Sequence, residues 1–286
     1  MNPSGIITLT TDFGVEDSYV GIMKGVILGI APAARLIDIT HQVSPQNIHQ
    51  GAYMVQTFDG YFPPGTVHLV VVDPGVGGDR AAIVLETPAA WFVAPDNGVL
   101  TYVWRDALEQ WGPGRCAVTE LTERRYWLAN VSSTFHGRDI FAPVAAHLAR
   151  GVPRTALGPE RPAITEAALE QPGPHRAGGL VGRIIHIDHF GNCITNITPR
   201  HLEQAGIGPE LTAELIGQHI PGLYRTYAHA PLGALMALIG SSDRLEIAVR
   251  NGNAAQTLGV GVGDSVRVYE RSSALQAANG RPTAAG

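Results

Sequence analysis

Lysine is nearly absent from this chain: Lys24 is the only one, and the other 19 of the 20 basic residues are arginines. This argues against chemistry that depends on a lysine, such as a Schiff base or a phosphate-binding P-loop. Cysteine is also scarce, because Cys116 and Cys193 are too few for a disulfide framework or a zinc site. Cys193 lies in an expected strand, where a small buried apolar side chain is the usual role.

Several short catalytic motifs are missing as well. Neither G-x-S-x-G nor H-E-x-x-H occurs in the sequence, which argues against the common serine hydrolases and zinc proteases. His41 and His49 do not have metal-ligand spacing with any nearby histidine, cysteine or glutamate pair. The sequence therefore predicts no metal site.

Strong charge and long apolar runs are lacking too. The formal net charge is only −5, so electrostatics predicts neither a nucleic-acid nor a membrane partner. No stretch approaches the roughly 20 apolar residues of a membrane span. The first residues, MNPSGIITLTTDFG, lack the basic and apolar regions of a signal peptide. Apolar residues make up 45% of the 286 residues, which is enough for one large or two modest cores. These features favour a cytoplasmic enzyme.

The first half of the chain alternates predicted strands and helices. The alternation predicts an α/β domain over residues 1–158, with a doubly wound sheet and helices on both faces. Period-2 and apolar runs predict strands at 6–10, 35–40, 66–72, 82–86 and 91–94. Helical spacing predicts helices at 19–30, at 47–58, from about residue 98, and over an apolar stripe that stops at Gly151.

The second half has a different composition. Residues 159–179 are rich in proline, glycine, alanine and glutamate, which predicts a linker. Short strands separated by glycine, asparagine and proline turns follow, and they predict a β-barrel over residues 180–270. The strands are expected at 180–187, 193–197, 213–216, 234–239, 245–249 and 265–269. The polar, alanine- and glycine-rich tail 271–286 is predicted to be disordered.

Three predicted strands end in polar residues: Asp12, Asp73 and the pair Asp96-Asn97. The carboxyl ends of parallel strands share one edge of a sheet, where ligands bind, so these residues are expected to meet at a pocket mouth. Asp12 or Asp73 could accept two hydrogen bonds from a ribose diol, although a lone aspartate there is more often a cap. Arg80 closes the turn DPGVGGDR, which lacks the GK[ST] ending of a phosphate loop.

Two further segments carry possible chemistry. His136, in FHGRD before a predicted helix, is a candidate base or water-positioning group, or with Asp139 a helix cap. The segment IDHFGN at 187–192 places an aromatic, a glycine and an asparagine between two strands. It fits contact with a planar heterocycle, and it also fits an ordinary β-turn, because Gly-Asn pairs are common there. Loops 240–243 and 249–254 flank strands and are ambiguous by themselves.

Six segments carry a stronger signal when they are taken in order. They are TTDFGVEDSYVGIMKG (10–25), DPGVGGDR (73–80), APDNG (94–98), the segment around His136, DHFGNCITNI (188–197) and GSSDRLEIAV (240–249). Together they resemble the S-adenosyl-L-methionine hydroxide adenosyltransferases, a family grouped with the fluorinase and chlorinase. The resemblance covers most of the chain between Ile6 and about Val268.

The resemblance implies a Rossmann-like N-terminal domain, a smaller C-terminal β-barrel, and a homotrimer that binds its substrate between subunits. The family's catalytic set corresponds to Asp73, Arg80 and His136. No cofactor is implied, because S-adenosyl-L-methionine is itself the substrate. The substrate-binding residues it implies are Asp12 at the ribose hydroxyls, Asp73, the segment residues Asp188, Phe190 and Asn192, and Ser242, Glu246 and Val249 around the adenine and the amino acid.

Two departures from the halogenases favour water as the nucleophile. The halogenases carry a tyrosine where this chain has Asp73, and they have an insertion where only residues 87–90 join two strands here. A carboxylate beside the attack position would also repel an incoming halide. We therefore expect hydrolysis to adenosine and L-methionine by attack at C5′. In this hypothesis Asp73 and His136 orient and deprotonate water, and Arg80 favours the developing hydroxide. The alternatives are a halogenase, a non-catalytic module that binds adenosine or S-adenosyl-L-methionine, and a metal-dependent hydrolase.

Overall fold

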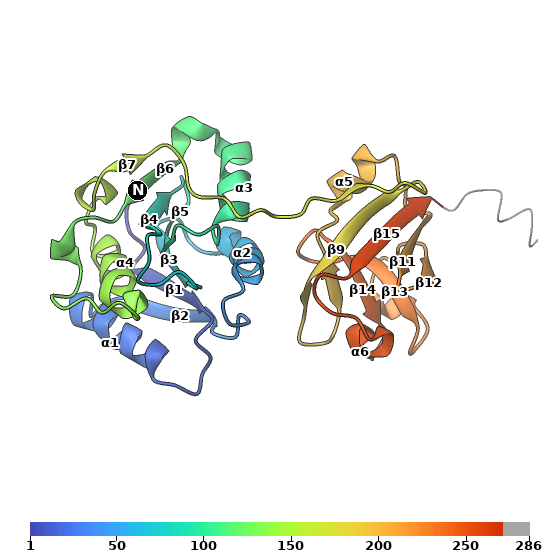
Figure 1. The fold of residues 1–286 in the computed structure, drawn as a ribbon, viewed down its shortest axis with the longest axis horizontal. Helices are drawn as coiled ribbons and strands as arrows, with labels where there is room; N and C mark the ends of the chain where they lie inside the picture. The colour runs from blue at the N-terminus through green and yellow to red at the C-terminus, as the bar shows by residue number, and fades with distance from the viewer. Residues whose placement is uncertain (271–286) are drawn as a thin grey trace, which may run out of the picture. The chain divides into compact units, whose positions relative to one another are not determined.

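The computed structural model describes residues 1–270, and the chain forms two compact units that divide between Leu169 and Glu170 (Figure 1). The predicted disordered tail, residues 271–286, lies outside the described residues. Each unit has its own sheet and its own hydrophobic core. None of the helices within residues 1–270 is long and apolar enough to cross a membrane.

Unit 1 contains a seven-stranded sheet in the order β2-β1-β3-β5-β4-β6-β7. Strands β2, β1, β3 and β5 are parallel, whereas β4, β6 and β7 are antiparallel to their neighbours. The doubly wound prediction therefore holds only for the parallel half. The strands β4 and β5 form a hairpin, because the short link between them cannot make a parallel crossover. The bounds are β1 Ile6–Thr11, β2 Arg35–Thr40, β3 Thr66–Val71, β4 Ala82–Glu86, β5 Ala90–Pro95, β6 Ala117–Glu120 and β7 Glu160–Arg161.

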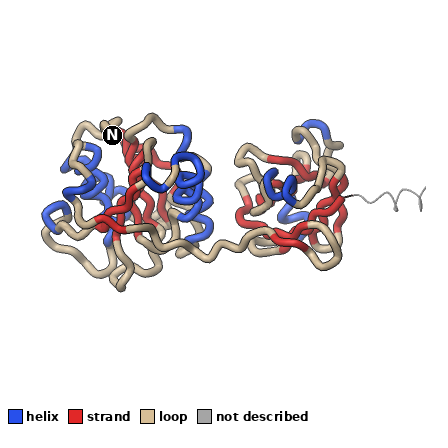
Figure 2. The backbone as a smooth tube through the Cα atoms, turned by 90° about the horizontal axis from the view of Figure 1, so that it is seen from above, coloured by secondary structure: helices blue, strands red, loops and turns tan. Residues whose placement is uncertain are grey.

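Helices cover both faces of this sheet, as Figure 2 shows. Helix α1 packs with α4, and α2 packs with α3. Alternate residues of β3 serve the two layers: Val67 and Leu69 join the α1/α4 core, and Val70 joins the α2/α3 core. The helices are α1 Tyr19–Ile30, α2 Ile48–Gln56, α3 Thr101–Trp111 and α4 Ala142–Ala149, with short turns η1 Asp59–Tyr61, η2 Pro113–Arg115, η3 Arg124–Tyr126, η4 Gly137–Phe141 and η5 Arg154–Ala156.

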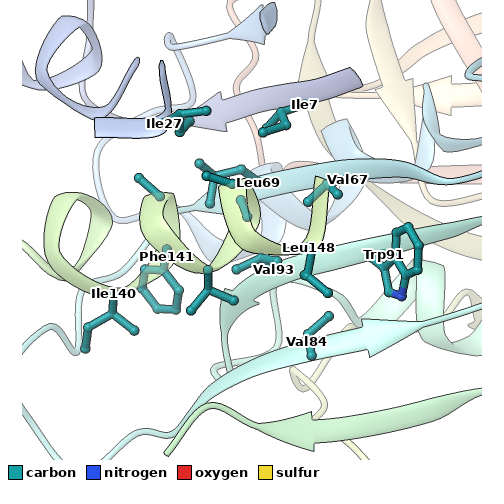
Figure 3. Close-up of a cluster of buried hydrophobic side chains, with 14 of the residues drawn as sticks. Ile7, Ile27, Val67, Leu69, Val84, Trp91, Val93, Ile140, Phe141 and Leu148 are labelled. Atoms are coloured by element: carbon teal, nitrogen blue, oxygen red, sulfur yellow. The ribbon is translucent and has the colours of Figure 1, made fainter. Parts of the chain in front are cut away.

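The α1/α4 core fixes the segment that carries His136. Phe141 and Leu148 are fully buried and pack with Leu69 and Val93 of the sheet (Figure 3). Burying large apolar side chains of this kind contributes about 1.5–3 kcal/mol each. The start of α4 is thereby held against the sheet, close to the ends of its parallel strands.

Unit 2 is an antiparallel sheet in the order β12-β11-β15-β9-β10-β14-β13, with β8 also paired to β9. Its two edge strands pack together, and a bridge from Leu223 to Ala237 nearly closes the sheet. This confirms the predicted fold class, a Rossmann-like α/β unit with a smaller C-terminal β-barrel. The elements are β8 Gly173–Pro174, β9 Leu180–Ile187, β10 Cys193–Thr195, α5 Pro199–Gln204, β11 Leu211–Leu215, β12 Gln218–Pro221, η6 Tyr227–His229, β13 Leu235–Ile239, β14 Leu245–Val249, α6 Ala254–Leu258 and β15 Ser265–Glu270.

The segment predicted as a linker, residues 159–179, contributes to both units. Strand β7 extends the sheet of unit 1, and β8 pairs with β9 in unit 2. Between them Asp96, which follows β5, accepts hydrogen bonds from the backbone N–H (2.6 Å) and hydroxyl (3.0 Å) of Thr165. Asp96 is only 6% exposed. Of the strand-end residues, Asp96 is therefore the one whose carboxyl group anchors the segment 159–179.

Candidate active site

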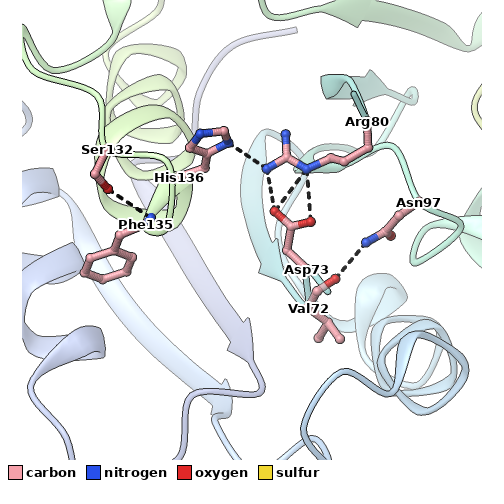
Figure 4. Close-up of polar contacts among 7 residues, drawn as sticks. All are labelled: Val72, Asp73, Arg80, Asn97, Ser132, Phe135 and His136. Atoms are coloured by element: carbon pink, nitrogen blue, oxygen red, sulfur yellow. Dashed lines mark hydrogen bonds and ion pairs between the residues drawn. The ribbon is translucent and has the colours of Figure 1, made fainter. Parts of the chain in front are cut away.

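The remaining strand-end residues meet as the sequence predicts. Strands β1, β3 and β5 are parallel neighbours, so Asp12, Asp73 and Asn97 follow strand ends at the same edge. The Asn97 side chain donates to the backbone oxygen of Val72 at 2.9 Å and ties the β5 end to the β3 end (Figure 4). Asp12 and Asp73 lie close enough for the charge of Asp73 to act on the carboxyl of Asp12.

Asp12 is half-buried and holds the loop that precedes α2. Its Oδ2 accepts the backbone N–H of Gln46 at 2.7 Å, next to Asn47, which caps α2. Burial raises the pKa of Asp12, and the charge of Asp73 adds to this rise, although the Gln46 hydrogen bond opposes it. The carboxyl of Asp12 is thus placed at the sheet edge with its loop fixed around it.

Asp73, Arg80 and His136 form one connected group (Figure 4). Arg80 Nε donates to both oxygens of Asp73 at 3.0 Å, and its terminal Nη2 donates to Oδ2 at 2.5 Å. The same Nη2 lies 2.8 Å from Nδ1 of His136. The side chains of Arg80 and Asp73 are only 11% and 4% exposed. The ion pair is therefore shielded from water and held in a forked geometry.

The glycine-rich turn and a phenylalanine hold Arg80 in place. Gly77 has φ +77°, and a Cβ there would lie 2.2 Å from the backbone oxygen of Ser133. Only glycine therefore lets this turn approach the segment before His136 so closely. On its other side, the guanidinium carbon of Arg80 lies 5.2 Å from the ring centroid of the buried Phe141, a cation–π contact.

The contact with Arg80 sets the proton arrangement of His136. A guanidinium only donates hydrogen bonds, so Nδ1 of His136 accepts and the neutral ring carries its proton on Nε2. Burial lowers the pKa of His136, and the charge of Arg80 lowers it further, against Asp73 and Asp139, which raise it. The histidine is therefore neutral at pH 7. Arg80 also lies between Asp73 and His136, an arrangement that sequence reasoning did not predict.

A cavity of about 650 Å³ opens beside this group within unit 1. Arg80 and His136 line it, together with Ser132, Thr122 and Trp127, whereas Asp12 and Asp73 do not. Within residues 1–270 no group of three or more histidine, cysteine, aspartate or glutamate side chains is arranged to hold a metal ion. The groups available for chemistry here are the charged side chains themselves.

A second cavity, of about 800 Å³, lies in unit 2. It gathers most of the C-terminal residues that the family resemblance singles out. Ser242 is not among the residues that line it, but the preceding residue, Ser241, is. The predicted residues that line the cavity are Asp188, Phe190, Asn192, Glu246 and Val249.

Asp188 shapes the turn that enters this cavity. Its Oδ1 accepts the backbone N–H groups of Phe190 (2.9 Å) and Asn192 (2.8 Å), and its Oδ2 accepts the Asn192 side-chain amide at 2.9 Å. Gly191 has φ +83°, and a Cβ there would overlap the side chain of Asn253. The turn leaves the ring of Phe190 exposed, at 72%. Residues 188–192 therefore form a turn, and the same turn leaves the ring of Phe190 available for contact with a ligand.

Glu246 faces the same cavity from β14. It is 6% exposed, and its Oε2 accepts the hydroxyl of Tyr227 at 2.8 Å. Burial raises the pKa of Glu246, and the charge of Asp188 adds to the rise, against the Tyr227 hydrogen bond. Burial and the bond to Glu246 also raise the pKa of Tyr227. Two carboxyl groups, two aromatic rings and the guanidinium of Arg250 thus share one cavity.

Sequence reasoning missed three contributors. Tyr227 lies in an irregular segment between β12 and β13 that has no motif to mark it. Phe141 reads as an ordinary residue of the apolar stripe, and only its position under Arg80 distinguishes it. The position of Asp139 in the sequence predicts a helix cap, but its carboxylate is fully buried and accepts the backbone N–H of Ser132.

Two family models match the chain. The SAM hydroxide adenosyltransferase N-terminal domain matches residues 7–158, and the SAM hydroxide adenosyltransferase C-terminal domain matches residues 182–267. A relative from Salinispora tropica named (R)-S-adenosyl-L-methionine hydrolase is 39% identical, with 94% of this chain and 99% of the relative covered. A fluorinase from Actinoplanes sp. is 30% identical, over 75% of this chain and 79% of the fluorinase. The crystal structure of an uncharacterized conserved protein from Thermotoga maritima superposes with a TM-score of 0.82, 37% identity, and coverage of 92% and 99%.

Proposed function

The chain belongs to the SAM hydroxide adenosyltransferase family, and we propose that it hydrolyses S-adenosyl-L-methionine to adenosine and L-methionine. Water or hydroxide attacks C5′, and methionine leaves. Relatives named as hydrolases are 36–44% identical to this chain, whereas those named as fluorinases are 27–30% identical. The observation that carries the proposal is the Asp73–Arg80–His136 group at the edge of the parallel strands.

The chemistry explains why no acid is needed. The sulfonium of the substrate makes C5′ electrophilic, and methionine departs as a neutral thioether. The barrier comes from the weak nucleophilicity of water, so the protein must orient the water and stabilise the developing hydroxide. Arg80 supplies a positive charge for this purpose, and it is held in advance by Asp73 and Phe141.

Asp73 and His136 take different parts in this proposal. Each oxygen of a carboxylate has lone pairs beyond those that Arg80 uses, so Asp73 can still accept a proton from water. His136 Nδ1 accepts from Arg80 and its Nε2 carries the proton, so in this proposal the ring orients water as a donor and takes no proton while that contact lasts. General base assistance of this kind is worth about 10²–10⁴ in rate.

We assign substrate recognition to the remaining residues. Asp12 would accept hydrogen bonds from the ribose hydroxyls. The exposed ring of Phe190, the amide of Asn192 and the carboxyl groups of Asp188 and Glu246 offer stacking, hydrogen bonds and negative charge in one cavity. These groups suit a planar base together with the positive charge of the substrate. Val249 and Ser242 complete the proposed set.

We also propose a homotrimer with the substrate between subunits, because the family resemblance implies it. Light scattering on the purified protein would test the assembly. From sequence composition and family resemblance, we propose a cytoplasmic location and no nucleic-acid partner. We also propose that the reaction needs no cofactor, because S-adenosyl-L-methionine is itself the substrate.

Mass spectrometry of the products formed in ¹⁸O-water, with and without chloride, tests the reaction. Adenosine that carries one ¹⁸O at the 5′ position would establish attack by water at C5′. A 5′-halogenated product would instead establish a halogenase. Unchanged substrate with tight binding would indicate a binding module. The short β4–β5 hairpin and the carboxylate of Asp73 both favour the first result.

A further inference from the structure

The segment that carries His136 continues into an unusual turn. Residues Gly137–Phe141 form a single π-helical turn that leads directly into α4. Such turns are rare and occur often at functional sites. The turn begins next to His136, whose ring accepts from Arg80, and it ends at Phe141, whose ring lies under the same guanidinium. Two of the contacts that hold Arg80 therefore depend on this one turn.

A fully buried carboxylate lies inside the turn. The side chain of Asp139 is 0% exposed, and an isolated charge there would be very costly. Its oxygens accept Arg138 Nε at 2.6 Å, Arg138 Nη2 at 3.0 Å and the backbone N–H of Ser132 at 2.8 Å. The backbone oxygen of Asp139 also accepts the N–H of Leu128 at 2.9 Å. The residue thus joins the turn to the segment that precedes His136.

Neighbouring contacts extend this link. Ser132 Oγ accepts the backbone N–H of Phe135 at 3.0 Å (Figure 4), and the guanidinium of Arg138 lies 5.1 Å from the ring centroid of Phe135. The Phe135 ring in turn contacts Phe13, which follows Asp12. The segment 132–138 around His136 is therefore held at Ser132, at Arg138 and through the ring of Phe135.

We propose that Asp139 is a positioning residue that holds the π-helical turn so that His136 and Phe141 both meet Arg80. This inference rests on the proposed hydrolysis. Asp139 does not touch Arg80 in the contacts described for residues 1–270, so it acts through His136 and Phe141. The charge of Asp139 also acts on His136 directly. It raises the pKa of the ring, as the charge of Asp73 does, whereas burial and Arg80 lower it.

The test variant is Asp139→Asn in the full chain. Asparagine keeps the shape and can still accept from Ser132, but it loses the charge and the forked bond to Arg138. Small displacements of catalytic groups can cost about 100-fold in rate, so we expect kcat to fall by about 10- to 100-fold with KM within about twofold. Without the negative charge the pKa of His136 falls, so the acidic limb of the kcat profile moves to lower pH.

The matched control is Glu86→Gln. Glu86 accepts Arg154 Nε at 2.6 Å in the same unit, so the control removes a similar ion pair away from the site. We expect its kcat and pH profile to match those of the unmodified protein. Histidine-selective NMR, with His136→Gln to assign the signal, measures the His136 pKa directly in each protein.

The outcomes separate cleanly. A folded Asp139→Asn protein with unchanged kcat, pH profile and His136 titration would overturn the proposal, even if it were less stable. Should this variant not fold, Arg138→Gln removes part of the same bonding at a more exposed position, and its kcat is expected to fall below that of the unmodified protein. Unchanged kcat in Arg138→Gln would then count against the proposal. If the unmodified protein does not hydrolyse S-adenosyl-L-methionine, the proposed function fails, but the His136 titration still decides the role of Asp139.

Discussion

The two units use carboxylates in opposite ways. In unit 1 Asp73 forms a forked ion pair with Arg80, which also contacts His136 and the ring of Phe141. In unit 2 the carboxyl groups of Asp188 and Glu246 accept hydrogen bonds from neutral donors: backbone N–H groups, an amide and the Tyr227 hydroxyl. In the first site one carboxylate is paired with one guanidinium, whereas the second cavity is lined by two carboxyl groups and a single arginine, Arg250, so negative charge is in excess there.

This difference suits two different tasks. A balanced, rigid group stabilises charge that develops during a reaction without reorganisation. A cavity with excess negative charge attracts a ligand that brings its own positive charge, as S-adenosyl-L-methionine does. We therefore expect changes in the Asp73–Arg80–His136 group of unit 1 to act mainly on kcat and changes in the cavity of unit 2 to act mainly on KM.

The largest effect is expected from Arg80→Ala. The change removes the positive charge and leaves Asp73 buried without its partner, so kcat should fall by about 10²–10⁴-fold while KM changes little. Arg80→Lys should not restore activity, because an ammonium cannot form the forked bond. Steady-state kinetics on folded variants checks both. A lysine variant with near-normal kcat would show that the charge alone matters and the geometry does not.

Acid should destabilise unit 1 more than unit 2, because unit 1 buries His68. This β3 residue is fully buried among Phe58, Phe62 and Phe92, and burial lowers its pKa to about 3. Well above pH 6.5 the histidine is neutral in both the folded and the unfolded state, so its titration costs no stability. As the pH falls from 6.5 toward 3, His68 becomes protonated in the unfolded chain but stays neutral in the folded unit. The free energy of unfolding therefore decreases by up to about 5 kcal/mol.

Chemical denaturation at several pH values measures this loss. The variant His68→Phe should flatten the pH dependence, although Thr8 loses its partner at 2.8 Å, which costs about 1 kcal/mol at every pH. The exposed His49 provides a control, since His49→Phe should leave the slope unchanged. An equally steep slope in both variants would place the acid sensitivity elsewhere.

In unit 2, Phe190→Ala tests the other side of the comparison. The ring is 72% exposed, so its removal should leave the unfolding temperature unchanged. Stacking of a base on an aromatic ring is worth about 1–3 kcal/mol, so KM should rise by about 10-fold while kcat stays within about twofold. A large loss of kcat with normal KM would contradict the division of tasks between the units.

The parts of this arrangement that the sequence predicts are those encoded locally. The apolar runs of β1 and β3 and the polar residues directly after them predict that Asp12 and Asp73 share an edge, because parallel pairing follows from the strand–helix alternation. The β4–β5 hairpin was missed as antiparallel, although its short link points to that pairing. Helices α5 and α6 have six and five residues, too few for a helical stripe to show.

The parts that the sequence does not predict depend on long-range contacts. The position of Arg80 between Asp73 and His136 follows from packing of the 73–80 turn against residues 56 positions away. Tyr227 reaches Glu246 across 19 residues, from a segment with no periodicity. Asp139 belongs to the FHGRD segment, but nothing in the sequence indicates that its side chain is buried. Family resemblance predicted which residues form the site, and only three-dimensional contacts show which of these groups bind one another.

The smallest effect, and the sharpest test of the comparison, is expected from Glu246→Gln. Burial and Asp188 raise the pKa of Glu246, so its charge opposes folding at neutral pH, and this penalty disappears as the pH falls below the ordinary glutamate range. Glutamine can still accept from Tyr227, so the variant should be slightly more stable at pH 7.5, with no gain near pH 4.

The Glu246→Gln variant should also bind a cationic substrate less well, with KM raised about fivefold by the loss of one partly screened charge. A charge kept at a cost to stability is best explained by a ligand that needs it. Lower stability with an unchanged KM would instead make Glu246 a structural partner of Tyr227, and the negative character of the cavity would then have no role in recognition.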